Sequence, residues 1–252
     1  LAPNRLYLVE GAPGSGKTTL ALQFLSTGRD AGEGCLYVTL SETREELAGV
    51  VASHGMSLEG IDVFELAAAE SAFSGGREMT LLHPWEVELG ETVKLITDEI
   101  ERLQPARVVF DSLSELRLLA QDSLRYRRQI LALKQFFAGR DATVLLLDDL
   151  TGSNGKADLQ LHSISHGVIS LERLTLEFGA ARRRLQVQKM RGAEFRGGYH
   201  DIEIRRGGLE LFPRLVASEH HTVFADDPLP SGLPELDALL GGGPLRGTCT
   251  LI

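Results

Sequence analysis

The chain has 252 residues, 43% of them hydrophobic, and carries a formal net charge of −9. This length suits one large α/β domain with a small appendage, and the hydrophobic share excludes a disordered chain. No apolar run reaches the length of a membrane span, so we expect no membrane contact. The acidic balance argues against a nucleic-acid partner, and we interpret the run Arg182-Arg183-Arg184 as a solvated strand end.

Cysteine usage and the start of the chain bear on where the protein resides. Cys35 and Cys249 each lie beside apolar, strand-like residues. This pattern is typical of reduced core residues and not of a disulfide framework. The first residue is Leu, and no charged-then-apolar leader opens the chain. We therefore expect a cytoplasmic protein of which this sequence is a shortened piece.

The first predicted elements surround a glycine-rich segment. Leu6–Glu10 is a short apolar run suited to a buried strand, and Leu20–Leu25 carries apolar residues at helical spacing. Between them Gly11–Thr18 reads GAPGSGKT, which fits the phosphate-binding loop pattern G-x-x-x-x-G-K-[ST]. Strand, glycine loop and helix are the context that this motif needs, because backbone N–H groups at a helix N-terminus then point at a phosphate.

The motif predicts the contacts of a nucleoside triphosphate and its metal. Lys17 can reach the β- and γ-phosphates, and the hydroxyl of Thr18 can ligate Mg²⁺. The alternative, a glycine turn that happens to precede a lysine, does not explain the flanking strand and helix. The residues that we expect to contact the nucleotide are Gly11, Ala12, Gly14, Ser15, Gly16, Lys17, Thr18 and Thr19.

Apolar runs and helical patterns alternate from here to about residue 171, which indicates a mainly parallel sheet covered on both faces. The predicted strands are Leu6–Glu10, Cys35–Leu40, Ile61–Leu66, Arg107–Asp111, Thr143–Asp148 and Gly167–Leu171. The predicted helices after the glycine loop include Thr43–Val51, Leu89–Leu103, Leu113–Leu119 and Tyr126–Phe137.

Three acidic positions at predicted strand ends are candidates for chemistry, because strand ends of an open parallel sheet line its ligand crevice. Asp111 is predicted to hold Mg²⁺ directly or through water, and its alternative role is a helix cap. Glu42 is predicted to orient or deprotonate the attacking water, unless Ser41 and Glu42 simply open the next helix. Asp148-Asp149 can sense the phosphate or be solvated loop acids, and the sequence leaves both open.

The last part of the chain changes pattern. Short strands at Leu174–Phe178, Leu185–Lys189, Asp201–Ile204 and Leu209–Phe212 predict antiparallel hairpins that extend the sheet. Residues 226–232 read as a linker, Leu233–Leu240 as a short helix and Thr248–Ile252 as a strand. Because 245–252 parallels 3–10 in layout, we expect an internal repeat: residues 1–225 form one domain and 233–252 the truncated start of a second. Whether 229–252 docks onto a first domain stays open.

Several segments match the pattern of one family: Gly11–Thr19, Ser41–Thr43, Val108–Ser112, His166–Leu171, Lys189–Gly192, and Ser231–Asp237 with Gly241–Gly243. Together they resemble a KaiC-type ATPase of the RecA superfamily, and the likeness covers nearly the whole chain. The resemblance implies a RecA-like P-loop core and the first domain of a tandem-domain member. The autophosphorylation of the related circadian clock proteins belongs to the second domain and does not carry over.

The resemblance also implies an Mg²⁺- and ATP-dependent ATPase that assembles as a ring, a hexamer when full length, with a regulatory role and a possible signalling partner. Lys189 and Arg191 would reach across to a neighbour's γ-phosphate, joining Lys17 and Glu42 as catalytic residues. The family often has two adjacent glutamates where this chain has Ser41-Glu42, so we expect slow hydrolysis if the first is the principal base.

Two other functions share the fold. A DNA-dependent recombinase- or helicase-like ATPase draws support from Arg182–Arg184, whereas a non-hydrolysing, ATP-gated scaffold draws support from Ser41. His162 and His166 lie four residues apart, but no third metal ligand is evident nearby. We expect His220-His221 to be solvated and Trp85 to anchor a loop.

Overall fold

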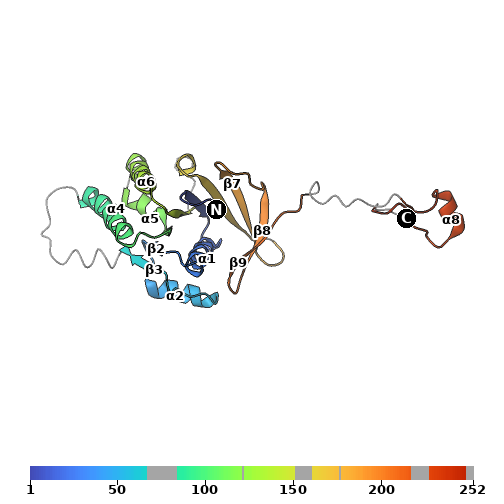
Figure 1. Ribbon diagram of the computed structural model, residues 1–252, viewed down its shortest axis with the longest axis horizontal. Helices are drawn as coiled ribbons and strands as arrows, with labels where there is room; N and C mark the ends of the chain where they lie inside the picture. The colour runs from blue at the N-terminus through green and yellow to red at the C-terminus, as the bar shows by residue number, and fades with distance from the viewer. Residues whose placement is uncertain (67–83, 121, 151–160, 176, 217–226, 248–252) are drawn as a thin grey trace. The chain divides into compact units, whose positions relative to one another are not determined.

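The computed structural model describes residues 1–66, 84–120, 122–150, 161–175, 177–216 and 227–247. The chain divides into two compact units, Leu1–Arg214 and Leu215–Ile252 (Figure 1). Cys249, His220-His221 and the predicted strand Thr248–Ile252 lie outside the described residues, as does the side chain of Trp85.

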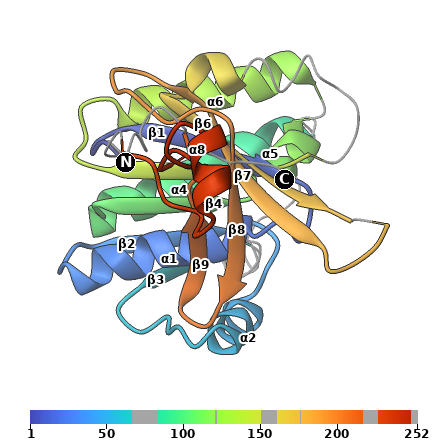
Figure 2. The ribbon, with the colours of Figure 1, turned by 90° about the vertical axis from the view of Figure 1, so that its right-hand side faces the viewer.

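The larger unit is built on one nine-stranded sheet in the order β3-β2-β4-β5-β1-β6-β7-β8-β9. The strands are β1 Leu6–Gly11, β2 Cys35–Thr39, β3 Asp62–Glu65, β4 Arg107–Asp111, β5 Thr143–Asp149, β6 Gly167–Leu174, β7 Arg182–Met190, β8 Tyr199–Arg205 and β9 Gly208–Phe212. Pairings from β3 to β6 are parallel, and those of β7, β8 and β9 are antiparallel. Figure 2 shows β8 and β9 side by side at the end of this extension. The predicted α/β fold with an antiparallel extension is confirmed.

Helices cover both faces of the parallel part. They are α1 Lys17–Asp30, α2 Arg44–Ser53, α4 Pro84–Leu103, α5 Leu113–Ala120 and α6 Ser123–Phe137. Leu6 and Leu8 of β1 pack in a core with α4, α5 and α6, whereas Tyr7 and Val9 pack in a second core with α1 and α2. Because successive side chains of a strand point to opposite faces, a strand covered on both sides is mostly apolar along its length.

One strand prediction is wrong. Leu174–Phe178 is not a separate strand, because β6 continues to Leu174, where it pairs with Arg182 at the start of β7. The chain then reverses direction, and Gly179 adopts a φ of 92°, which side chains disfavour. The sequence pattern also missed that residues 161–164, just before β6, are helical.

The smaller unit contains the predicted short helix, seen as α8 Pro234–Leu239. A single bridge pairs Pro228 with Leu245, and none of the residues of α8 is buried. Across the described residues of both units, no helix is long and apolar enough to cross a bilayer.

Candidate functional site

The carboxyl ends of β1, β2, β4 and β5 surround a hollow of about 610 Å³, named here the phosphate site. Such a position is where open parallel sheets bind ligands. The lining includes the predicted catalytic and metal-binding residues Lys17, Thr18, Glu42 and Asp111, the predicted nucleotide contacts Gly14, Gly16 and Thr19, and also Asp149. Gly11, Ala12 and Ser15, predicted to contact the nucleotide as well, are not among the lining residues.

The glycine loop takes backbone conformations that require glycine. Gly14 and Gly16 have φ values of 76° and 109°, in the region that L side chains rarely adopt. A Cβ on Gly11 would lie 2.3 Å from the carbonyl oxygen of Leu171. Gly16 is the N-cap of α1 and provides no side-chain hydrogen bond to the helix. The first-turn N–H groups therefore form the positive end of a helix that can receive an anion.

Lys17 is buried at this helix start. Its Nζ donates to the carbonyl oxygens of Gly11 (2.8 Å) and Ala12 (3.1 Å) and lies 2.7 Å from Oδ1 of Asp149. Asp149 is thus an ion-pair partner of the loop lysine. Asp148 is 1% exposed and pairs with Arg117 at 2.6 Å. Neither residue is a simply solvated loop acid, whereas phosphate sensing by this pair stays a prediction.

Thr18 and Asp111, the two predicted metal ligands, lie together. Thr18 Oγ1 donates to Asp111 Oδ2 at 3.1 Å, and the hydroxyl of Tyr37 donates to the same oxygen. Burial raises the pKa of Asp111, although these two hydrogen bonds oppose the shift. Burial and the charge of Asp111 likewise raise the pKa of Tyr37 well above its usual value. The Asp111 carboxylate therefore accepts hydrogen bonds from Thr18 at the glycine loop and from Tyr37 of β2.

These two oxygens suit a magnesium ion that keeps most of its other ligands from phosphate and water. The described residues contain no group of three or more His, Cys, Asp or Glu side chains that could hold a metal by themselves. The donor set therefore fits a metal that arrives with a nucleotide.

Glu42 lines the phosphate site, and its side chain is partly buried there. Its Oε2 is buried and has no hydrogen-bond partner among the described residues. Burial, followed by the charges of Asp111, Glu46 and Asp149, raises the pKa of this carboxyl. The backbone is pinned by Thr39, whose Oγ1 donates to the Glu42 carbonyl (2.8 Å) and accepts from the Glu42 N–H (2.9 Å).

The alternative role of Ser41 and Glu42 as the opening of α2 is not what the structure shows. Thr43 is the N-cap of this helix, and it forms a capping box with Glu46. The Glu42 side chain is therefore not needed to start the helix, and it is left available to the site.

Lys189 and Arg191, named here the cation pair, do not line the phosphate site of their own chain. Lys189 Nζ donates to the carbonyl oxygens of His162 and Ser165, the second at 2.8 Å. Arg191 Nη2 donates to the carbonyl oxygen of Ser163 at 2.9 Å. Burial, followed by the charges of Arg191 and Lys134, lowers the pKa of Lys189.

The sequence missed how the antiparallel extension reaches the glycine loop. Arg183 and Ile204 line the phosphate site, as does His54. Arg183 Nε lies 3.4 Å from the carbonyl oxygen of Gly14, and Ile204 lies 3.1 Å from where a Cβ on Gly16 would be. The interpretation of the arginine run as a solvated strand end is therefore wrong for Arg183. The run of three arginines was the sequence feature that could have indicated this contact, but sequence spacing could not show which arginine lies near the glycine loop.

His162 and His166 contact different groups and do not face one ligand. His162 Nε2 lies 2.7 Å from Oε2 of Glu10, and Nδ1 of His166 accepts from the Leu6 N–H at 3.2 Å. Burial and nearby positive charges lower the pKa of His166.

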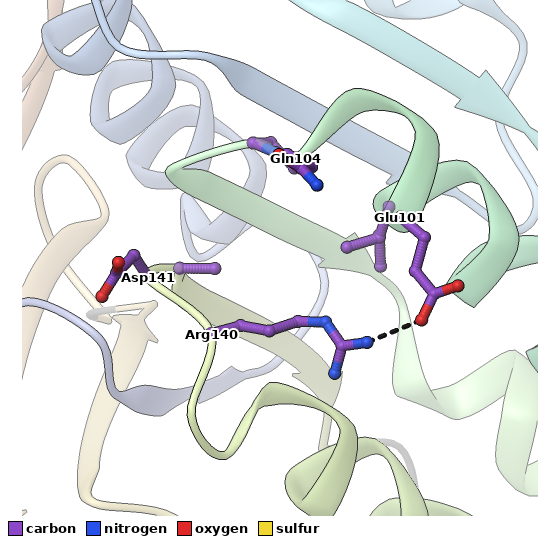
Figure 3. Close-up of a pocket in the computed structure, with 7 residues that line it drawn as sticks. Glu101, Gln104, Arg140 and Asp141 are labelled. Carbon is purple, nitrogen blue, oxygen red and sulfur yellow. Dashed lines mark hydrogen bonds and ion pairs between the residues drawn. The ribbon is translucent and has the colours of Figure 1, made fainter.

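A second hollow of about 550 Å³ lies before the amino ends of β4 and β5 (Figure 3). There Arg140 Nη2 forms an ion pair with Glu101 Oε1 at 2.6 Å, so the two charges offset each other. Asp141 accepts from the side chain of Asn4 at 2.8 Å. The hollow contains none of the sequence motifs, and the chemistry of the described residues points to the phosphate site.

Comparison with known proteins decides the family. The sequence model of the ATPase family KaiC matches residues 1–216. The chain belongs to the KaiC family of ATPases. A solved KaiC-like protein of the hyperthermophilic archaeon Pyrococcus horikoshii superposes with a TM-score of 0.69 over 84% of this chain and 91% of that one. Its sequence is 22% identical, so this likeness supports the fold alone.

Curated relatives of this KaiC-family chain fall into two groups. A UPF0273 protein of Pyrococcus horikoshii is 28% identical over 219 residues, covering 84% of this chain and 87% of that protein. The circadian clock oscillator protein KaiC of Thermosynechococcus vestitus is 28% identical over 209 residues. That match covers 82% of this chain but only 38% of the clock protein, so this chain spans less than half of it.

Proposed function

We propose that this KaiC-family chain binds ATP with Mg²⁺ at the phosphate site and hydrolyses it, as a slow regulatory ATPase of the cytoplasm. The observation that carries the proposal is the meeting of Lys17, Thr18, Asp111 and Glu42 around one hollow. A loop lysine, a hydroxyl beside a strand-end carboxylate, and a second carboxylate with one buried oxygen that lacks a hydrogen-bond partner among the described residues are the parts that phosphoryl transfer to water needs.

Each residue has a distinct role in this proposal. The N–H groups at the start of α1 and Lys17 bind the phosphates, and for this Lys17 exchanges the Asp149 carboxylate for a phosphate oxygen. Thr18 and Asp111 hold Mg²⁺, which when bound neutralises charge on the β- and γ-phosphates. Glu42 orients the attacking water and takes up its proton, a task that a raised pKa favours near neutral pH.

The cation pair extends the proposal to an assembly. Lys189 and Arg191 line no part of their own phosphate site, so we propose that they complete the site of a neighbouring copy in a ring, a hexamer when full length. Cations placed on the transferred phosphoryl group stabilise charge in the transition state. We further propose that residues 1–225 form the ATPase domain and that 233–252 open a second domain of the same kind, with a signalling protein as partner.

The test is a comparison of wild type with Lys17→Ala, using Lys94→Ala on the exposed face of α4 as the matched control. We expect Lys17→Ala to lose Mg-ATP binding by a factor of about 100 or more in calorimetry, because the ammonium group contacts two phosphates. The control should bind normally. ATPase activity that persists unchanged in Lys17→Ala would defeat the proposal.

A second candidate, the non-hydrolysing scaffold, is favoured by one observation. Ser41 stands where the family often has the first of two glutamates, and it is exposed at the rim of the phosphate site. Nucleotide would then hold copies together without turnover. Single-turnover release of phosphate by purified assemblies eliminates this candidate, whereas assembly with ATP but no release supports it.

A further inference from the structure

Glu10 is a buried carboxylate that the proposed chemistry does not use. It directly precedes the glycine loop and is 4% exposed. Its Oε2 lies 2.7 Å from Nε2 of His162, and its Oε1 accepts from Ser170 Oγ at 2.6 Å. Because a buried charge is costly unless its oxygens are satisfied, these contacts tie the end of β1 firmly to His162 and β6.

His162 belongs to the segment that holds the cation pair. Residues 161–166, named here the docking turn, begin with the helical residues 161–164 and lead into β6. The ring of His162 contacts Glu10, whereas its carbonyl oxygen accepts from Lys189 Nζ. The next carbonyl, that of Ser163, accepts from Arg191 at 2.9 Å. One residue therefore faces the phosphate-loop strand on one side and the cation pair on the other.

A second route joins the same two regions. Gln188 Nε2 donates to Ser170 Oγ at 2.6 Å, and Ser170 in turn donates to Glu10. Gln188 precedes Lys189 in β7. One oxygen of the Glu10 carboxylate thus leads through His162 to Lys189, and the other leads through Ser170 to Gln188, the residue before Lys189.

The other end of the route is the phosphate loop. Glu10 is joined by a peptide bond to Gly11, whose carbonyl oxygen accepts from Lys17 Nζ at 2.8 Å. A phosphate that draws Lys17 away releases this carbonyl, one residue from Glu10. Hydrogen bonds of a buried network depend on one another because the local dielectric is low.

We propose that Glu10 and His162 are positioning residues that fix the docking turn, and thereby link a chain's own phosphate loop to the cation pair that it offers a neighbour. The inference rests on the proposed function, because it assumes that the cation pair acts in a neighbouring copy.

The experiment uses assemblies mixed from two protomers. A Lys17→Ala protomer lacks a working phosphate site but offers its cation pair. A protomer with both Lys189→Ala and Arg191→Ala keeps its phosphate site but offers no pair. Activity in the mixture arises where the phosphate site of the second meets the pair of the first. His162→Leu is then added to one or the other.

We expect the effect to depend on the protomer that carries His162→Leu. On the pair-donating protomer, kcat should fall at least tenfold more than on the site-donating protomer, with KM for ATP unchanged. His162→Gln on the pair-donating protomer should restore most of the activity, because its amide can donate to Glu10. His200→Gln, which alters a buried histidine in β8, is the control. An equal loss in both placements, or no loss in either, overturns the inference.

Should His162→Leu fail to fold, His162→Ser replaces it, because His162 is partly exposed and tolerates a small polar residue. A second readout needs no turnover. The amides of His166 and Arg191 donate to the carbonyls of Leu6 and His166, both at 2.8 Å, so their hydrogen exchange reports on the docking turn.

We expect Mg-ADP to change the exchange of these two amides at least tenfold more in wild type than in His162→Leu. Equal changes overturn the link. If wild type neither binds nor hydrolyses ATP, the proposed function fails. If wild type hydrolyses ATP with the cation pair in trans but His162 has no effect, the present inference alone fails.

Discussion

Lys17 and Lys189 are both held by carbonyl oxygens, Lys17 buried and Lys189 half-buried, yet different groups surround their charges. Lys17 has a carboxylate partner, Asp149, at 2.7 Å. Lys189 has, among the described residues, only the carbonyls of His162 and Ser165 as hydrogen-bond acceptors. Burial and the charges of two nearby cations, Arg191 and Lys134, lower the pKa of Lys189.

The comparison shows two ways in which this fold holds a lysine side chain in place. A carboxylate cancels the charge of an ammonium group, whereas a carbonyl satisfies its hydrogen bonds and leaves the charge in place. Lys17 is therefore balanced within its own site by Asp149. Lys189 is held in position by carbonyl oxygens that leave its charge in place, which suits the role proposed for it in a neighbouring copy.

The largest expected effect tests the cation pair, to which Lys189 and Arg191 belong. Arg191→Ala should lower kcat about 1,000-fold or more, as removal of an arginine finger does, and should leave the affinity for Mg-ATP nearly unchanged. Phosphate release gives kcat, and calorimetry gives affinity. Arg182→Ala, at the exposed start of β7, is the matched control. A parallel loss of affinity would show that the pair binds nucleotide in its own chain and would break the comparison.

Glu42→Gln should lower kcat about 100-fold or more, since it removes a general base. It should also stabilise the nucleotide-free protein at pH 7. Burial and neighbouring carboxylates raise the pKa of Glu42, so the folded state binds this proton more tightly than the unfolded chain does. Stability is then lost as pH rises from the unfolded to the raised pKa, and glutamine avoids this loss.

Thermal unfolding of the Glu42→Gln protein at two pH values checks the sign. The variant should have the higher Tm at pH 7, and the gain should vanish below the ordinary carboxyl pKa of 4.5. A lower Tm at pH 7 would show that the Glu42 carboxylate has a stabilising partner in the folded protein.

The smallest expected effect tests the ion pair between Lys17 and Asp149. Asp149→Asn should raise the affinity for Mg-ATP several-fold, because the phosphate no longer competes with a carboxylate for Lys17. Calorimetry measures the change, and Asp141→Asn at the distant hollow is the control. Unchanged affinity would mean that Asp149 does not restrain Lys17, and the contrast between the two lysines would weaken.

The phosphate loop and the parallel core could be predicted from the sequence because their causes are local. Glycine at positions 14 and 16 permits positive φ values, and the lysine that follows opens a helix. Alternating apolar runs and helical periods predicted the strands from β1 to β5 to within one or two residues. Asp111 could be singled out in the sequence because it ends a buried strand, β4.

The errors arose where distant partners decide. The length of β6 depends on its pairing with β7, so the local apolar pattern at Leu174–Phe178 indicated a strand that does not form. The role of Arg183 depends on how β7 folds back toward Gly14, a residue 169 positions away.

By itself, the sequence determined that a glycine loop precedes a helix between apolar strands, with a carboxylate at a strand end and two cations two residues apart. The tertiary structure alone decided that Asp149 faces Lys17, that Glu10 holds His162, and that carbonyl oxygens hold the cation pair. The reason is physical: backbone preferences act over a few residues, whereas charge pairing and burial depend on which distant segments the sheet brings together.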